Sequence, residues 1–263
     1  MSNRTAIARV EGRGHLRGSL LLTGIIALVC GFMFVAFPGI QAEAEAVQEA
    51  FPEPMLELLG IEALDTIEGF LASYPYAFIW VLLAGLYVAY LTAGSVVDDI
   101  RKRRMDMTLA NPVTRESVVL QKVAGLWLPL LVLNAGLFAV VLVGTVLLGE
   151  HVNLVSLVMA HLLSLPYLLV CAGIGMVFSV TLDRTASAQA AAIGGVFVLW
   201  LVEAASHLDP DLEWVGLVAP SHYYDPTAIL VHEEYALLDA AVLLAAFLGL
   251  LAVAIAIFAR RDV

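Results

Sequence analysis

Three side chains of the types used in a nucleophile–base–acid triad lie close together near residue 220: Ser221, His222 and Asp225. They stand in a short segment with proline at both ends, Pro220 and Pro226. Two prolines so close together favour a turn, and a turn does not hold a catalytic triad in place. The sequence therefore argues against catalysis at this segment.

Metal and nucleotide motifs are incomplete. His232 and Glu233 begin like the helical zinc motif, but Ala236 stands where the second histidine is required. A phosphate-binding loop needs Gly-Lys-Ser/Thr, whereas the two lysines, Lys102 and Lys122, follow Arg101 and Gln121. We therefore expect no metal site, no cofactor and no nucleotide hydrolysis by this chain alone.

A few polar side chains fall inside or near long apolar runs: Asn134, His161, Glu203 and His207. An ion-coupled carrier would be expected to keep buried acids with partners near the middle of the bilayer, and none is central here. Glu203 and His207 are one helical turn apart, which leaves a proton relay open. An intramembrane enzyme would use these groups together with His222 and His232.

The elements that position these residues are long apolar helices. Of the residues, 61% are hydrophobic and 14% charged, which is too little polar surface for a soluble domain. About twenty apolar residues cross a bilayer as a helix. Six runs qualify, at 18–38, 76–97, 123–148, 154–182, 188–205 and 239–259. The sequence predicts an all-α, multi-pass membrane protein of six transmembrane helices, with residues 1–263 as one domain.

The basic residues fix the expected orientation. All 13 lie before the first run, between runs two and three, between runs four and five, or after the last. Lys and Arg are retained on the cytoplasmic side, so both termini are expected inside the cell, in the plasma membrane. The intervening segments hold sixteen acids and no Lys or Arg. One interpretation is an acidic vestibule that concentrates cations. The other is a solvated outer surface suited to high salt, for which we expect a halophilic archaeon as the source.

Two further helical features are expected. The first external segment, 39–75, is predicted to contain an amphipathic helix over about 55–72, with acids opposite its apolar face. The residues before the first span suggest either a basic helix on the membrane surface or a disordered tail. The external helix is expected to cap the tops of neighbouring spans, and a basic helix before the first span would lie on the cytoplasmic leaflet.

Small residues at helical spacing mark candidate helix contacts, because they let helices approach closely in lipid. One face lies in the second span and one in the fifth. Their members are Gly85, Ala89, Ala93, Ala188, Ala192 and Gly195. The partner helix is expected in the same chain or in a second copy.

The longest and most charged cytoplasmic loop is 98–122. Asp98 and Asp99 end the second span, a basic run follows, and the Asn-Pro pair at 111–112 forces a turn. Thr114 is placed as an N-cap, and Glu116 favours the first turn of the next helix. The loop is thus predicted as a helix, a turn and a second helix that enters the third span. A basic anchor on anionic lipid would explain the arginines but not the interspersed acids and methionines.

This loop resembles that of the type-2 ATP-binding-cassette (ABC) export permeases. In that family it runs from acidic and basic residues through a Gly-Thr pair to Leu, a Pro-Val-Ser-Arg turn and a Lys. The matching positions are Asp98, Arg103, Asp106, Thr108, Leu109, Pro112, Val113, Thr114, Arg115 and Lys122. Met107 stands where the family often has Gly, and Thr114 replaces Ser.

The resemblance implies a permease subunit that docks a separate cytoplasmic ABC ATPase through this loop and assembles with a second permease, identical or different. The expected coupling residues are Asp98, Asp99, Arg101, Arg103, Arg104, Met105, Asp106, Met107, Thr108, Leu109, Pro112, Thr114, Arg115 and Glu116. Met105, Met107 and Leu109 are expected to enter a groove on the ATPase, and Arg103, Arg104 and Arg115 to pair with its acids.

Two other functions remain open from the residues alone. One is the intramembrane enzyme described above, and the other is a membrane scaffold or assembly factor that transports nothing. No nucleic-acid partner is expected. The cargo is not specified, because no buried polar constellation selects one.

Overall fold

The computed structural model describes residues 5–44, 46, 50, 63–208 and 210–261. These residues form helices and turns, with no strand among them. Their elements, in chain order, are α1 (Ala6–Ala42), α4 (Ile67–Leu71), η1 (Ala72–Ala84), α5 (Gly85–Arg101), α6 (Arg104–Leu109), α7 (Arg115–Ala124), α8 (Trp127–Leu148), α9 (Leu154–Thr181), α10 (Thr185–Ser206), η2 (Pro210–Leu212), α11 (Glu213–Gly216), η3 (Pro220–Tyr223), α12 (Pro226–Leu230) and α13 (Leu237–Arg260).

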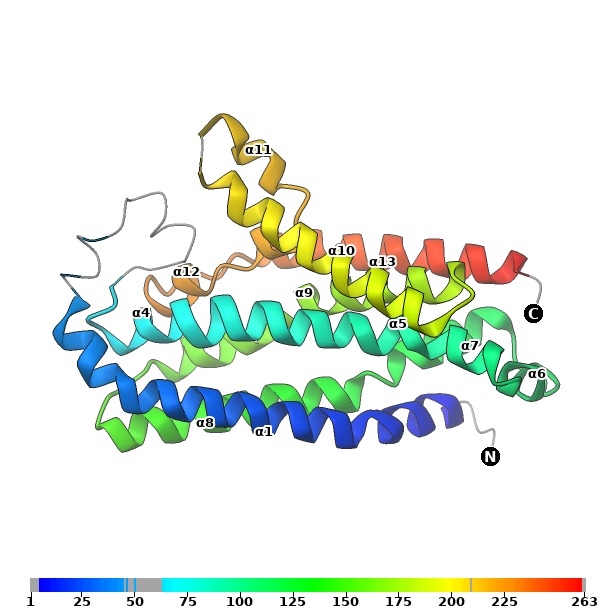
Figure 1. Ribbon diagram of the computed structural model, residues 1–263, viewed down its shortest axis with the longest axis horizontal. Coiled ribbons are helices and arrows are strands. Elements are labelled where there is room, and N and C mark those ends of the chain that lie inside the picture. Colours follow the sequence, from blue (N-terminus) through cyan, green and yellow to red (C-terminus); the bar gives the residue numbers. More distant parts are fainter. Residues whose placement is uncertain (1–4, 45, 47–49, 51–62, 209, 262–263) are drawn as a thin grey trace.

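The long helices run side by side as one bundle (Figure 1). Within lipid every backbone N–H and C=O must pair inside its own segment, which is why apolar runs of this length form helices. Six stretches of the described chain are long and apolar enough to cross a membrane. The prediction of an all-helical protein with six membrane-crossing helices is confirmed.

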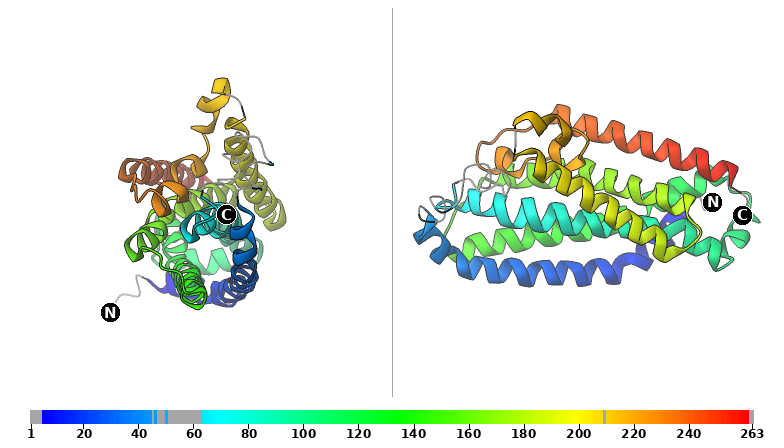
Figure 2. Two further views of the ribbon diagram at one scale, coloured as in Figure 1. Left: turned by 90° about the vertical axis from the view of Figure 1, so that its left-hand side faces the viewer. Right: turned by 45° about the horizontal axis from the view of Figure 1, so that its top comes forward.

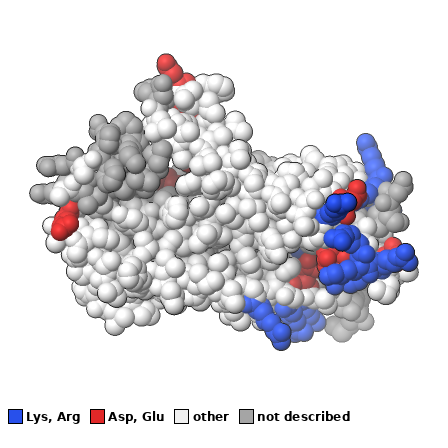
Figure 3. Space-filling view, in the orientation of Figure 1, with Lys and Arg blue, Asp and Glu red and all other residues white. Residues whose placement is uncertain are grey.

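The two ends of the bundle differ in charge. The N-terminus, α6 and the C-terminus lie at one end, while α4 and α12 lie at the other (Figure 1). In the space-filling view the Lys and Arg side chains of this face gather at the end that carries α6, together with several acids (Figure 3). We call it the basic end. Between the two ends this face shows few acidic or basic side chains (Figure 3).

Two helices form the centre of the bundle. Of the most apolar stretch of each span, 67% is buried in the second (Ile67–Arg101) and 61% in α9. The pair α1 and α8 lies on one side of this centre, and α10 and α13 lie on the other (Figures 1 and 2). The far end of α10 leans out of the bundle with α11 attached (Figure 2). The four outer helices therefore expose most of their apolar surface.

The second span is longer than the sequence indicates. It begins at Ile67, nine residues before the expected start at Tyr76, and runs unbroken through α4, η1 and α5 to Arg101. The middle portion, η1, is π-helical and contains Pro75. Proline has no N–H to donate, and π-helical geometry is one way in which a helix accommodates a break in its regular hydrogen bonds. The proline that was expected to lie outside the membrane helix is thus inside it.

Of the amphipathic helix expected over 55–72, only residues 63–72 lie within the described part of the chain. Residues 51–62 lie outside the described part of the chain. The part that is described begins with a turn, in which Ala63 has a positive φ of 52°. Thr66 then caps α4, because its side chain accepts a hydrogen bond from Gly69 N. Residues 67–72 belong to the second span.

Several other helix boundaries can be compared with those expected from the sequence. The first helix is continuous over Ala6–Ala42, so residues 6–17 form neither a separate surface helix nor a disordered tail. Gly125 and Leu126 interrupt the third span between α7 and α8. The loop between α9 and α10 is only 182–184, because α10 begins at Thr185, three residues before the expected start of the fifth run at 188. The ends of α9 and α13 fall within two residues of the sequence-based limits of 154–182 and 239–259.

The contact between α5 and α9 depends on glycine at position 175. A Cβ atom there would lie 2.2 Å from the carbonyl oxygen of Ala89. We expect Gly175→Ala to destabilise the protein by about 1–3 kcal/mol, the usual range for overpacking. The measurement is the temperature at which the monodisperse fraction of the purified protein is lost in mild detergent.

Gly249→Ala is the matched control, because nothing lies within 4 Å of a Cβ at that position in α13. It is expected to leave stability unchanged or raise it by about 0.5–1 kcal/mol. Equal thermal stability of the two variants would contradict close packing between α5 and α9.

Candidate functional site

The basic end of the bundle carries a helical hairpin that joins the second and third spans. It consists of α6, a turn and α7, and we call residues 102–124 the hairpin. The Oγ1 atom of Thr114 accepts a hydrogen bond from Ser117 N at 3.2 Å, and Glu116 lies in the first turn of α7. The N-cap, the turn and the two helices are those that the sequence predicts. Both arms of the hairpin lead directly into membrane-crossing helices.

The sharp reversal from α5 to α6 occurs at Arg103. Its backbone is left-handed, with φ 54° and ψ 22°. For a residue other than glycine this conformation costs roughly 1–2 kcal/mol. The Arg103 side chain is exposed and makes no ion pair among the described residues. The reversal therefore presents a free guanidinium at the tip of the basic end.

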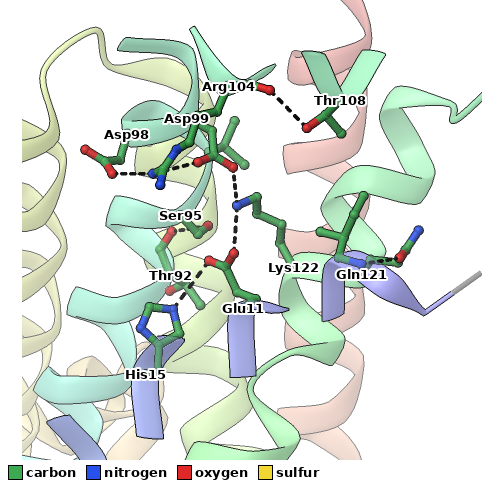
Figure 4. A network of polar contacts seen from close by, with 12 residues as sticks. Glu11, His15, Thr92, Ser95, Asp98, Asp99, Arg104, Thr108, Gln121 and Lys122 are labelled. Carbon is green, nitrogen blue, oxygen red and sulfur yellow. Dashed lines mark hydrogen bonds and ion pairs between the residues drawn. The ribbon is translucent and has the colours of Figure 1, made fainter. Parts of the chain in front are cut away.

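A buried lysine lies at the base of the hairpin. The Nζ atom of Lys122 contacts Glu11 Oε2 at 2.8 Å and Asp99 Oδ2 at 2.6 Å, and its side chain is only 3% exposed (Figure 4). Glu11 belongs to α1 and Asp99 to α5, so one ammonium group joins three helices. A charge removed from water is tolerated only when opposite charges and hydrogen bonds replace its hydration. The two carboxylates provide that compensation.

The same network extends outward to water. Arg104 contacts Asp98 at 2.7 Å and Asp99 at 2.8 Å, and Lys102 contacts Asp98 at 2.8 Å. We call Glu11, Asp98, Asp99, Lys102, Arg104 and Lys122 the ion-pair network. Its outer members are half-exposed or exposed, so their individual pairs are each worth about 0–1 kcal/mol. The inner pairs of Lys122 are the ones that fix the hairpin against the spans.

Close backbone packing accompanies the network. A Cβ atom on Gly12 would lie 2.8 Å from the carbonyl oxygen of Gly125, and one on Gly125 would lie 2.8 Å from Glu11 Cβ. Ile7 N also donates a hydrogen bond to Gln121 Oε1 at 3.3 Å. The first three turns of α1 therefore lie against α7, where the absence of side chains permits contact between the two helices.

The expected coupling residues divide by exposure. Exposed are Arg101, Arg103, Arg104, Asp106, Met107, Pro112, Thr114 and Glu116. Half-buried are Asp98, Asp99, Thr108, Leu109 and Arg115. Met105 is fully buried in the core. The structure brings all of them to the basic end, but only the first group is exposed at its surface, and Arg104 within that group is paired with Asp98 and Asp99.

Three expectations for individual side chains are corrected. Met105 was expected to project from the loop, but α6 folds back on α5 and buries it completely. Arg104 was expected to pair with a partner, but it is bound to Asp98 and Asp99. Leu109 is half-buried and packs against the core. Of the three expected apolar contacts, Met107 alone is freely accessible, at 65% exposure.

Arg115 also acts within the chain. Its Nη1 atom donates to the carbonyl oxygens of Phe258 and Arg261 at the end of α13. The guanidinium lies 5.7 Å from the centre of the Phe258 ring, a cation–π distance. The arginine that was expected to pair with acids of a partner instead holds the last helix of this chain.

The small-residue faces lie between helices of the bundle. Gly85, Ala89 and Ala93 are buried on α5, and a Cβ on Gly85 would lie 2.6 Å from the hydroxyl of Tyr167 in α9. Ala188 and Ala192 are fully buried on α10. Gly195 is half-buried near Phe178 of α9. Both faces are therefore occupied by neighbours within the chain.

The histidines do not converge. His161 is buried between Tyr76 Oη, 2.9 Å from Nε2, and Asn134 Oδ1, 3.1 Å from Nδ1. His207 contacts Glu203 at 2.8 Å near the far end of α10. In the described part of the chain, no three His, Cys, Asp or Glu side chains are close enough to hold a metal. His161 and His207 thus each have a local partner, and they lie apart from one another.

Two residues of the basic end were missed from sequence. The sequence pattern gives no role to Glu11, and it gives Arg261 none beyond the expected orientation of the chain. A signal for the first was present, since Glu11 is the one acid in a stretch of four arginines before the first span. For Arg261 nothing distinguishes it from its neighbour Arg260 except the folded contact.

Comparison with known proteins gives one family. The model of a family described as "ABC-2 family transporter protein" matches residues 5–263. No curated protein matches the chain.

Removal of the buried ammonium should loosen the basic end. We expect Lys122→Met to destabilise the protein by about 3–5 kcal/mol, because the partly buried Glu11 loses its lysine counter-charge and Asp99 is left with Arg104 alone. Thermal unfolding in mild detergent measures this loss. Lys102→Met is the matched control, with an expected effect of about 0–1 kcal/mol, since Lys102 is 60% exposed.

A double variant separates the charge effect from simple loss of packing. Adding Glu11→Gln to Lys122→Met removes one of the uncompensated charges and should restore part of the lost stability. If the double variant is no more stable than Lys122→Met alone, an uncompensated charge does not explain the loss of stability.

Proposed function

The chain belongs to the ABC-2 family of transporter proteins, and on that premise we propose that it is the permease subunit of an ABC export system. It is a multi-pass membrane protein with six helices able to cross the bilayer. In the proposed system, ATP is hydrolysed by a separate cytoplasmic ATPase that binds the hairpin, and two permease subunits assemble with two ATPases. Cargo is moved outward.

The proposed orientation places the basic end in the cytoplasm. Support comes from the distribution of charge, since the helix ends at the basic end carry the arginines and lysines of the described chain. Positively charged segments are held back during insertion, so such an end is expected inside the cell. Both chain termini then lie in the cytoplasm, with α11 and α12 outside.

One observation carries the proposal for ATPase docking. Arg103 and Met107 are exposed together at the tip of a hairpin whose two arms continue into the second and third spans. A lever that passes on the movement of a soluble motor must be accessible at its tip and rigid at its base. The tip provides a charge and an apolar knob, and the ion-pair network provides the rigid base.

The division of the expected coupling residues refines the proposed interface. Contact with the ATPase is assigned to four exposed residues: Arg101 at the end of α5, Arg103 at the reversal, and Asp106 and Met107 on α6. Positioning of the hairpin is assigned to Asp99, Arg104 and Arg115, which bind within the chain. An acidic rim with a shallow apolar slot is the complementary surface expected on the ATPase.

Substitution at the tip tests the docking proposal. We expect the double variant Arg103→Glu, Met107→Ser to lose co-purification with the ATPase in mild detergent, because it reverses the charge and removes the knob. Thermal stability should remain unchanged, since both side chains are exposed. Arg17→Glu is the control, because Arg17 is an exposed base on α1 outside the hairpin. Undiminished ATPase binding by a correctly inserted tip variant would show that the docking proposal is wrong.

Cysteine accessibility tests the proposed orientation. The native cysteines, Cys30 and Cys171, are both fully buried, so a single added cysteine reports its own position. With a membrane-impermeant maleimide we expect Met107→Cys to react only after the cells are opened, and His151→Cys to react in intact cells. The reverse pattern would show that the hairpin faces outward and would exclude docking to a cytoplasmic ATPase.

A further inference from the structure

The last arginine of the described chain caps the end of another helix. The guanidinium of Arg261, just beyond α13, donates hydrogen bonds to the carbonyl oxygens of Val180 at 2.7 Å and Leu182 at 3.0 Å. A longer contact reaches Ser179 O at 3.5 Å, and Asp183 Oδ1 lies at 2.6 Å. The final carbonyls of a helix have no partners within the helix, and a cation there also interacts favourably with the helix dipole. Arg261 thus satisfies the end of α9 and holds the loop to α10.

The end of α13 is capped in turn by the hairpin. Arg115, the first residue of α7, donates to the carbonyl oxygens of Phe258 and Arg261. Its guanidinium also lies near the ring of Phe258, which is itself fully buried. Arg115 therefore links the hairpin to the end of α13, and Arg261 links the end of α13 to the end of α9.

These two arginine caps connect α7, α13 and α9 through hydrogen bonds to backbone carbonyl oxygens. Beginning at α7, it reaches α13 through Arg115, and then α9 and the loop at 182–184 through Arg261. Lys122, on the same short helix, reaches α1 and α5. Two residues of α7, Arg115 and Lys122, thus link the hairpin to α13, α1 and α5. Through Arg261 the link extends to α9.

We propose that Arg261 is a positioning residue that makes the hairpin, the end of α13 and the loop at 182–184 move as one unit. The inference rests on the proposed function for the force that moves the hairpin, but the tether itself is a property of this chain alone. Through the contacts of Arg261, movement of the hairpin also moves the fourth and sixth spans, in addition to the second and third.

The carbonyl contacts carry the tether, and the contact with Asp183 adds little. The side chain of Arg261 is 15% exposed, whereas that of Asp183 is 92% exposed. An ion pair with so exposed a partner is screened by water and contributes little. Several carbonyls in different directions suit the planar fork of arginine and not the single point charge of lysine. Arg261→Lys should therefore fail to replace the native residue, and Asp183→Asn should be tolerated.

The neighbouring residue provides a matched control. Arg260 is exposed in the last turn of α13 and makes no hydrogen bond or ion pair among the described residues. Arg260→Gln and Arg261→Gln remove the same charge from adjacent positions. Any difference between the two variants reports the contacts of Arg261 and not the net charge of the basic end.

The experiment measures the distance between the hairpin and the loop directly. Spin labels are placed at Leu120→Cys on α7 and Ser187→Cys on α10, both exposed, while the native cysteines are buried. Pulsed dipolar spectroscopy on the purified permease in nanodiscs then gives the distribution of distances. We expect a narrow distribution in the parent and in Arg260→Gln, and a broadened or shifted one in Arg261→Gln and Arg261→Lys. Equal distributions in the Arg260→Gln and Arg261→Gln variants would overturn the tether.

A second variant protects the test against misfolding. Arg115→Gln breaks the same path at its other step and leaves the contacts of Arg261 with α9 in place. If Arg261→Gln does not yield folded protein, broadening in folded Arg115→Gln supports the tether, and an unchanged distribution overturns it.

The ATPase complex separates this inference from the proposed function. In the complex trapped with ATP and vanadate, we expect the distance between the labels to stay unchanged in the parent and to change in Arg261→Gln. Failure of the parent to bind any ATPase would defeat the proposed function, while the comparison in the permease alone would still decide the tether. A trapped complex in which Arg261→Gln behaves like the parent would overturn the delivery of movement through Arg261.

Discussion

The arrangement of the basic end depends on the burial of one ammonium group. Lys122 is removed from water and faces two carboxylates from different helices, so α1, α5 and α7 can close only together. An unpaired charge in that position would cost about 3–5 kcal/mol, so arrangements that separate Lys122 from its carboxylates are disfavoured. Glycines at 12 and 125 then allow the backbones to meet beside it. Charge compensation at the membrane edge thus sets the position of the hairpin.

The short helix α7 joins two kinds of contact that serve one purpose. Lys122 on one face binds carboxylates, and Arg115 at its start binds carbonyl oxygens at the end of α13. Side chains that a partner was expected to use are consumed in this way, and the tip of α6 is left with Arg103 and Met107. The proposed docking surface is consequently small, while the structure behind it is extensive. Such a division suits a part that receives force at one point and spreads it among several spans.

Features fixed by local sequence were predictable, and those fixed by distant contacts were not. The six spans follow from apolar length, and the Thr114 cap follows from residues only three positions apart. By contrast, Lys122 meets Glu11 across 111 residues, and Arg261 meets Val180 across 81. The burial of Met105 depends on how α6 packs against α5, which no periodicity in six residues can reveal. The early start of the second span was hidden because Pro75 normally marks the end of a helix.

The left-handed backbone at Arg103 has an evolutionary consequence. Glycine would adopt that conformation without strain, and asparagine nearly so, and either would make the reversal more stable. A sequence that keeps arginine there accepts lower stability in exchange for a cation at the apex. Proteins need only remain above a threshold of stability, so a loss of this size is tolerated where it serves activity. Among homologues that lack the proposed docking function, this position is where drift toward glycine should appear first.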